Sequence, residues 1–200
     1  MKLEIILQIV GAALGLLYLY FEYKANIYLW IVGLIMPAVN GFLYFQKGIY
    51  ADVGMNIYYI LAGIYGWIIW NNHKPESGKA YSISKTPLKK WLHLAFLFVI
   101  IDIFITYILI KFTNSKVPYV DAFTTSLSII AMWMLSRKYV EQWLVWLVVD
   151  AVTCCLYFYK NIPISASLYL LYSCLAIAGY LRWLRMMKDE AASQKISFHK

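Results

Sequence analysis

The sequence predicts an all-α membrane protein with seven transmembrane helices, and three observations support this fold class. Hydrophobic residues make up 62% of the 200 residues and charged residues only 14%, a composition too apolar for an ordinary soluble domain. The apolar residues form seven long runs, and about 20 such residues cross the hydrocarbon layer as a helix. The gaps between the runs are short, so little chain is left for a soluble domain.

The predicted spans cover residues 3–21, 27–45, 49–70, 91–112, 119–135, 140–159 and 162–184. The fifth span is the weakest prediction because it is short and carries Asp121 near its start. The longest connection, 71–90, is polar and basic and contains Pro75 and Gly78. That composition indicates a flexible hinge between two halves of the chain.

Positive charge is distributed unequally between alternate gaps, and this inequality predicts the orientation. Of the 18 lysine and arginine residues, five fall on one side of the predicted membrane and thirteen on the other. Because the richer side is expected to be cytoplasmic, the N-terminus is predicted outside and the C-terminus inside. The basic residues lie in the gaps and form no single stripe, which argues against a nucleic-acid partner.

An internal repeat without gaps relates the two halves at an offset of 113 residues. The segment LYFQKGIYADVGMNIYYILAGIYGWIIW, at 43–70, aligns with LYFYKNIPISASLYLLYSCLAIAGYLRW, at 156–183. An offset of four spans preserves direction across the membrane, so two parallel three-helix repeats joined by a fourth helix are expected, a 3+1+3 arrangement. Chance similarity between apolar stretches is the alternative. The predicted organisation is a first repeat at 1–71, a cytoplasmic loop and linking helix at 72–116, a second repeat at 117–186 and a cytoplasmic tail at 187–200.

One face of the sixth span carries the strongest functional signal. Asp150 lies near the middle of this span, where an ionised carboxylate costs about 2.5–3.5 kcal/mol on insertion scales. Trp143, Trp146 and Asp150 are spaced i, i+3, i+7 and share one face of a helix. Two indole rings beside a carboxylate suit a flat, cationic ligand. The alternative is an aromatic belt residue at Trp143 and a structural acid at Asp150, but the three together favour a binding site.

Other polar residues within the spans extend this candidate site. Asn40 and Asn56 lie in the second and third spans, which the repeat aligns with the sixth and seventh, so they are expected to face Asp150 across a pseudo-two-fold axis. Hydrogen bonding between helices is the alternative for both amides. Tyr59 completes the predicted binding residues. Asp102, in the fourth span, is either a proton relay or a structural acid, and the structural role is favoured.

No nucleophile motif, phosphate loop or metal-ligand spacing occurs in the sequence. We therefore expect neither an enzyme nor a cofactor. A membrane sensor or assembly protein, whose buried polar groups only hold helices together, is the alternative of a different class.

The segment RKYVEQWLVWLVVD, at 137–150, resembles the most characteristic stretch of the PnuC family of vitamin transporters, WxxWxxxN. YGWIIW, at 65–70, is similar to the end of that family's first-half block, and the resemblance covers nearly the whole chain. It implies a SWEET-like 3+1+3 fold in a bacterial cytoplasmic membrane and facilitated diffusion of an unphosphorylated vitamin, which a kinase then traps. It also implies a midplane site at Trp143, Trp146 and Asp150, with polar contacts from Asn56, and leaves a homo-oligomer open.

Two positions depart from the usual pattern of that family's nicotinamide riboside carriers, which have asparagine at the place of Asp150 and glutamine at that of Asn56. A carboxylate lacks the two amide donors and adds a negative charge, which suits the aminopyrimidine and thiazolium of thiamine. Thiamine, carried by the PnuT branch, is therefore the expected substrate. The alternatives are nicotinamide riboside, which is also a cation, and proton-coupled transport through Asp102 and Asp150.

Overall fold

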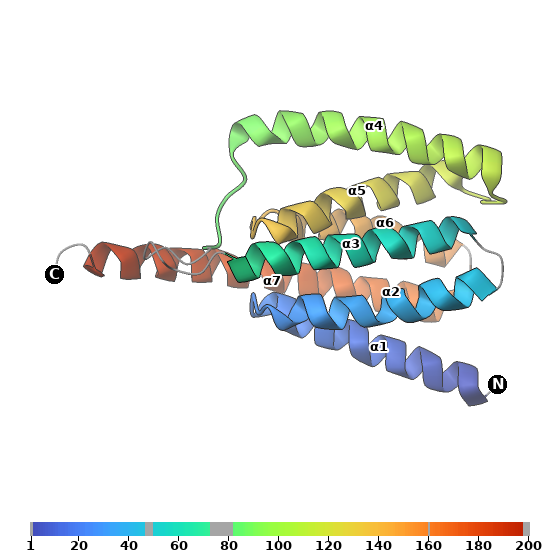
Figure 1. The fold of residues 1–200 in the computed structure, drawn as a ribbon, viewed down its shortest axis with the longest axis horizontal. Coiled ribbons are helices and arrows are strands. Elements are labelled where there is room, and N and C mark those ends of the chain that lie inside the picture. The colour runs from blue at the N-terminus through green and yellow to red at the C-terminus, as the bar shows by residue number, and fades with distance from the viewer. Residues whose placement is uncertain (1, 47–49, 73–81, 160, 198–200) are drawn as a thin grey trace. The chain divides into compact units, whose positions relative to one another are not determined.

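The computed structural model describes residues 2–46, 50–72, 82–159 and 161–197, and its regular elements in these ranges are seven α-helices (Figure 1). The expected all-α class is confirmed. The helices are α1 (Lys2–Tyr23), α2 (Tyr28–Gln46), α3 (Tyr50–Asn72), α4 (Leu88–Phe112), α5 (Pro118–Ser136), α6 (Gln142–Tyr159) and α7 (Pro163–Ser197).

Within the described residues, four helical segments are long and apolar enough to cross a membrane: Val53–Asn72, Leu88–Phe112, Gln142–Tyr159 and Ser165–Ser193. A shorter apolar helix covers Tyr28–Phe42. The helix α5, which corresponds to the fifth predicted span, is not among the four, in agreement with its weak signal in the sequence. Its start is polar, and the Ser115 hydroxyl donates a hydrogen bond to Asp121 at 2.6 Å.

The helix α7 continues 13 residues beyond the predicted end of the seventh span, from 184 to 197. The added residues are mostly Arg, Met, Lys, Glu, Ala and Gln, which favour helix, and none is glycine or proline. Loss of hydrophobicity therefore marks where the apolar span ends without ending the helix. The predicted tail at 187–200 is helical as far as the structure describes it.

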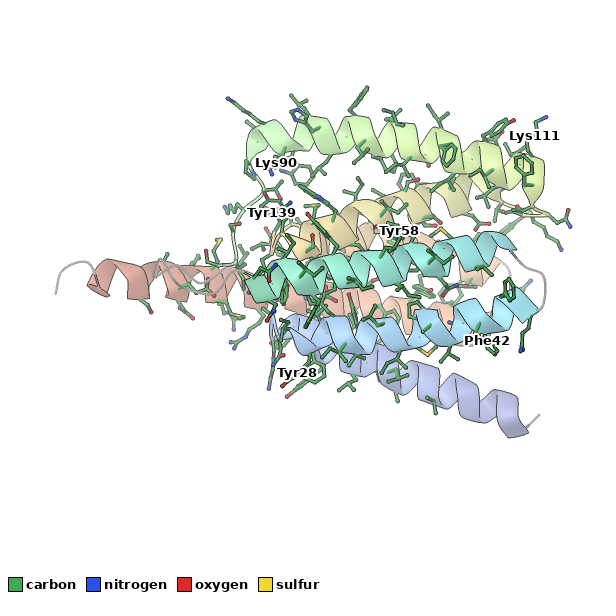
Figure 2. All side chains as sticks on the ribbon, viewed as in Figure 1. Tyr28, Phe42, Tyr58, Lys90, Lys111 and Tyr139 are labelled. Carbon is green, nitrogen blue, oxygen red and sulfur yellow. The ribbon has the colours of Figure 1, made fainter. Side chains whose placement is uncertain are left out.

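The chain divides into two compact units, residues 1–81 and 82–200. In the first unit α1 packs against α2, and α2 packs against α3. In the second unit α4 packs against α5, α5 against α6, and α6 against α7. A buried cluster joins α4 to α5 and to the turn that follows α5; it contains Leu94, Ile130, Met134 and Tyr139. Lys90 lies at the same end, with its ammonium 5.9 Å from the Tyr139 ring centroid (Figure 2).

The turn that precedes α2 is repeated before α6. Ala25 (φ 49°) and Lys138 (φ 52°), 113 positions apart, both adopt the left-handed conformation that often ends a helix. The amide after Ala25 donates to the carbonyl of Phe21 at 2.9 Å, and the amide after Lys138 donates to that of Met134 at 3.0 Å. These donors and acceptors are also 113 positions apart, so the repeat in sequence is a repeat of backbone geometry.

A tryptophan packed over a glycine is the second repeated feature. In the first unit the Trp30 ring covers Gly66 and meets Trp70 edge to face, with ring centroids 5.5 Å apart and planes at 88°. The residues 113 positions later form the same arrangement, with centroids 5.9 Å apart and planes at 86°. This second set consists of Trp143, Gly179 and Trp183. Chance similarity between apolar stretches would not reproduce the same packing.

The linker segment 82–87, just before α4, is bound to the second unit. The Ser84 amide donates to the carbonyl of Lys138 at 3.1 Å, and the Val140 amide donates to the carbonyl of Ser84 at 3.0 Å. Both the amide and the hydroxyl of Thr86 donate to a Glu141 carboxylate oxygen at 2.8 Å. The predicted flexible hinge at 71–90 is therefore wrong for 82–87, because carboxylate and carbonyl acceptors satisfy its backbone. Residues 73–81 lie outside the described part.

Candidate functional site

The neighbours of α6 define four sides of this helix. Successive residues of an α-helix are rotated by about 100°. Val145 packs on the cluster of α4 and α5, which marks the side toward α5. Trp143 and Cys154 contact Gly179 and Ala166 of α7, which marks a second side. Leu144 and Val148 are exposed and mark the outer side.

The fourth side of α6, which we call the inner arc, consists of Gln142, Trp146 and Asp150. These residues follow each other at i, i+4 and i+8 and span about 80° of the helix. On the helical wheel they lie between the side toward α5 and the side toward α7, opposite the outer side. Two of the predicted site residues, Trp146 and Asp150, are therefore brought together with a third polar side chain that the prediction did not include.

Two of the three polar side chains of the inner arc have buried polar atoms without hydrogen-bond partners among the described residues. Gln142 is 0% exposed, and neither its amide oxygen nor its amide nitrogen makes a hydrogen bond there. The indole Nε1 of Trp146 is likewise unpaired within this part of the chain. Asp150 is 8% exposed, and the hydroxyl of Tyr172 in α7 lies near its carboxylate. An unsatisfied buried donor or acceptor lowers the stability of the fold by about 1–3 kcal/mol, so such a cluster is typical of a site that binds a ligand or water.

The structure places Trp143 at the edge of this arc, in the interface between α6 and α7. Its side chain is 2% exposed, one region of the ring covers Gly179, and Trp183 meets it edge to face. Trp30 occupies the equivalent position in the first unit and is packed in the same way. The ring of Trp143 therefore supports the packing of α6 on α7, while its indole Nε1, like that of Trp146, has no hydrogen-bond partner among the described residues. That either tryptophan binds a ligand stays a prediction.

The remaining predicted binding residues belong to the first unit. Asn40 lies on α2, and Asn56 and Tyr59 lie on one face of α3; all three are half-buried. A side-chain carbon on Gly41 would lie 3.3 Å from the Asn56 Cβ, so α2 and α3 approach closely at this level. That these amides face Asp150 stays a prediction, because it depends on how the two units pack.

Asp102 lies on α4, beside residues that pack against α5. Its Oδ1 atom is buried and has no hydrogen-bond partner among the described residues. The helix α5 contacts both α4 and α6 and lies between them in the order of packing. No hydrogen bond or ion pair among the described residues connects Asp102 to Asp150, so a proton path through both acids stays a prediction. Among the described residues there is also no group of three or more His, Cys, Asp and Glu side chains that could hold a metal ion.

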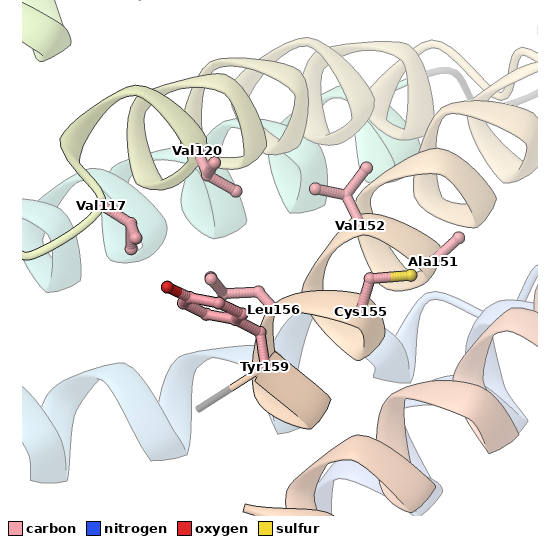
Figure 3. A pocket seen from close by; sticks show the side chains of 7 residues that line it. All are labelled: Val117, Val120, Ala151, Val152, Cys155, Leu156 and Tyr159. Atoms are coloured by element: carbon pink, nitrogen blue, oxygen red, sulfur yellow. The ribbon is translucent and has the colours of Figure 1, made fainter. Parts of the chain in front are cut away.

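An apolar cavity of about 550 Å³ lies on a different side of α6 (Figure 3). Its walls come from the start of α5 and from the outer side of α6 and its side toward α5, and the polar side chains among the lining residues are Tyr159 and Cys155. Recognition of a polar vitamin requires several convergent polar groups, so the inner arc is the better candidate. The lining residues are Val117, Val120, Ala151, Val152, Cys155, Leu156 and Tyr159.

Two residues of this region, Gln142 in the inner arc and Tyr172 near it, were not among the residues predicted from the sequence. Tyr172 aligns with the predicted Tyr59 at the offset of 113, so the repeat already contained the signal for it. Gln142 stands four residues before Trp146 and eight before Asp150, and that spacing also was readable. Its position at the end of the predicted span, where polar residues are common, concealed it.

Comparison with known proteins identifies the family. The family model described as "Nicotinamide mononucleotide transporter" matches residues 5–185. The nicotinamide riboside transporter PnuC of Escherichia coli (strain K12) is 23% identical over 210 residues, with 93% of this chain and 88% of the relative covered. The riboflavin/roseoflavin transporter RibM of Streptomyces davaonensis is 26% identical over 189 residues, covering 91% and 86%.

A second nicotinamide riboside transporter PnuC, from Neisseria mucosa, is 27% identical over 196 residues and covers 90% of this chain and 72% of the relative. The crystal structure of the vitamin B3 transporter PnuC has the same fold, with a TM-score of 0.69, 24% identity, and coverage of 90% of this chain and 81% of that chain. Because the family match covers almost the whole sequence, this chain belongs to the nicotinamide mononucleotide transporter family and is a membrane vitamin transporter of the PnuC type, not an enzyme.

Proposed function

We propose that this transporter carries unphosphorylated thiamine by facilitated diffusion, with Trp146 and Asp150 as its principal binding residues. The observation that carries the proposal is the Asp150 carboxylate on the inner arc, whose side chain is only 8% exposed. A buried carboxylate needs a cation or a hydrogen-bond donor to offset its desolvation. Thiamine offers both, in its thiazolium ring and its amino group.

Trp146 supplies the second element of recognition. It lies four residues before Asp150, a rise of about 6 Å along α6. A flat cationic ring stacked on the indole therefore lies within reach of the carboxylate. Trp143 contributes indirectly in this proposal, because its contact with Gly179 fixes α6 against α7 and so fixes the direction of the inner arc. Asn40, Asn56 and Tyr59 stay proposed binding residues, on the ground of their positions in the sequence repeat.

Nicotinamide riboside is the second candidate substrate, because two of the relatives are named as its transporters. It is a flat cation as well, and its carboxamide and hydroxyl groups can donate hydrogen bonds to Asp150. Asparagine at this position is the usual residue of such carriers, whereas a carboxylate favours a ligand with more donors and positive charge. The presence of Asp150 is the reason for preferring thiamine.

The proposed arrangement is two parallel three-helix repeats joined by α4, with the N-terminus outside a bacterial cytoplasmic membrane and the C-terminus inside. The repeated turn and the repeated tryptophan and glycine packing support it, because parallel repeats require equivalent helix pairs. The excess of lysine and arginine in alternate connections supports the orientation. Net uptake would follow from phosphorylation of the vitamin by a kinase inside the cell.

Titration calorimetry on purified protein in detergent tests the substrate. Thiamine, nicotinamide riboside and riboflavin are each titrated into the natural chain, Asp150→Asn and the matched control Asp102→Asn. A charged hydrogen bond is worth about 1.5–3 kcal/mol, so Asp150→Asn should weaken thiamine binding by about 10- to 150-fold. Asp102→Asn should leave it unchanged. Failure of the natural chain to bind thiamine below millimolar concentration, with tight binding of nicotinamide riboside, would establish the second candidate.

A further inference from the structure

Gln142 is a buried polar residue that is not among the binding residues proposed above. Its side chain is 0% exposed, and both amide atoms lack a partner among the described residues. Its backbone is satisfied separately, since its amide N–H donates to the carbonyl of Tyr139 at 3.2 Å. The side chain therefore is not used to cap α6, and the turn before the helix does not require it.

The internal repeat shows that the fold does not need an amide at this position. Leu29 is the residue 113 positions earlier and occupies the same place in the equivalent turn. It is also 0% exposed, with the same backbone bond from its amide to the residue three positions before. An apolar side chain of similar size thus fills the equivalent position in the first unit. Gln142 has polar atoms where packing alone would favour a leucine.

We propose that Gln142 binds the substrate and reads a paired donor and acceptor on its ring, such as an aminopyrimidine edge or a ring carboxamide. This inference rests on the proposed transport of a vitamin with such an edge. A primary amide presents one acceptor and two donors in a plane, and it forms two parallel hydrogen bonds with a complementary edge. Such a contact requires both polar atoms of the amide to be available, and neither has a partner among the described residues.

The position of Gln142 along α6 matches a substrate with two different ends. Gln142 and Asp150 are eight residues apart, a rise of about 12 Å, and Trp146 lies midway between them. A molecule that places its neutral hydrogen-bonding ring at Gln142 can stack near Trp146 and place its cationic ring toward Asp150. The inner arc then recognises hydrogen-bonding pattern, ring shape and charge at three successive turns of one helix.

The test pairs a protein variant with a ligand variant. Gln142→Met and Gln142→Leu replace the amide by apolar side chains of similar volume, and Leu29→Met is the matched control in the other repeat. The probes are thiamine and its analogue 3-benzyl-5-(2-hydroxyethyl)-4-methylthiazolium, which keeps the cation but has a benzyl group in place of the aminopyrimidine. Affinity is measured by titration calorimetry, and the melting temperature of each ligand-free protein is measured alongside.

The Gln142 variants should bind thiamine at least 10-fold more weakly than the natural chain and bind the benzyl analogue unchanged, with ligand-free melting temperatures equal to or above that of the natural chain. Equal thiamine affinity in the Gln142 variants would overturn this inference alone, and it would assign the amide to a buried water. A fall in ligand-free melting temperature in both Gln142 variants would also overturn it, because the amide would then be structural. Absence of thiamine binding by the natural chain would overturn the proposed thiamine transport together with it.

Discussion

Substitution of Gly179 by alanine tests the packing that orients the inner arc. A Cβ atom at this position would lie 2.6 Å from Cε2 and Cζ2 of Trp143 and 2.7 Å from Cδ2. Real Cβ contacts of this length essentially do not occur, so either α6 and α7 separate or the indole turns. The indole has little freedom to turn, because it is 2% exposed and Trp183 packs against it.

The expected cost follows from the geometry of the clash. Added carbon atoms in a packed core cost about 1–3 kcal/mol, and contact with three atoms of a rigid ring places Gly179→Ala in the upper part of this range. For a chain of this length, each kcal/mol lowers the melting temperature by about 2–4 °C. Gly179→Ala should therefore lower it by about 4–12 °C, and ligand affinity should fall as well, because the inner arc would be displaced.

The assay is thermal unfolding of purified protein in detergent, followed by intrinsic tryptophan fluorescence. Gly54→Ala is the matched control, because a Cβ at Gly54 would meet nothing within 4 Å, and it should change stability by less than about 1 kcal/mol. Trp143→Phe combined with Gly179→Ala should recover at least half of the loss, since the smaller ring vacates the space. Equal melting temperatures for Gly179→Ala and Gly54→Ala would refute the reasoning.

Three further predictions use other features of the structure. Thr86→Val keeps the hydrogen bond from the backbone amide to Glu141 but removes the one from the hydroxyl, so it should lower the free energy of unfolding by about 1 kcal/mol. Thr86→Ser, which keeps the hydroxyl, should have a smaller effect in the same thermal unfolding assay. Ala25→Gly should raise stability by up to about 1 kcal/mol, because glycine adopts φ 49° without strain; a lower melting temperature would contradict this. Uptake into liposomes should not respond to an imposed pH gradient, and Asp102→Asn should leave the rate unchanged; a rate that rises with inward proton flow would instead support coupling.

The fold class was predictable because lipid imposes a length and a composition on every helix that crosses it. The same reasoning could not locate the end of α7, since hydropathy reports where apolar residues stop and not where helix-forming residues stop. It also misjudged the linker segment 82–87. The hydrogen-bond acceptors that hold this segment belong to Lys138 and Glu141, more than 50 residues away in sequence. The composition of the segment itself therefore could not predict these hydrogen bonds.

The candidate site was predictable to the level of one helix. Periodicity placed Trp143, Trp146 and Asp150 on one half of α6, but the packing of the Trp143 ring depends on a glycine in α7. That contact was implicit in the repeat, which aligned Gly66 with Gly179. The spacing on α6 alone could not show that the Trp143 ring also packs on α7, because that contact depends on a residue of another helix.

The two repeats share their scaffold and differ in the inner arc. Both contain the left-handed turn and the tryptophan over glycine, which are the features that join the helices. The three positions of the inner arc, however, correspond in α2 to Leu29, Gly33 and Pro37, which have no polar side-chain atoms. At Gly33 the Tyr18 ring occupies the space beside the backbone, as a Cβ there would lie 2.9 Å from it.

This difference makes the repeat itself a source of controls for the proposed function. Substitutions at the shared positions, such as Gly66 and Gly179, remove the same packing and should both lower stability. Substitutions at corresponding positions of the arc should separate, because Leu29 contributes packing alone whereas Gln142 has polar atoms with no structural partner among the described residues. A change at Leu29 should therefore alter stability without altering which vitamin is bound. A change at Gln142 should alter vitamin binding without lowering stability.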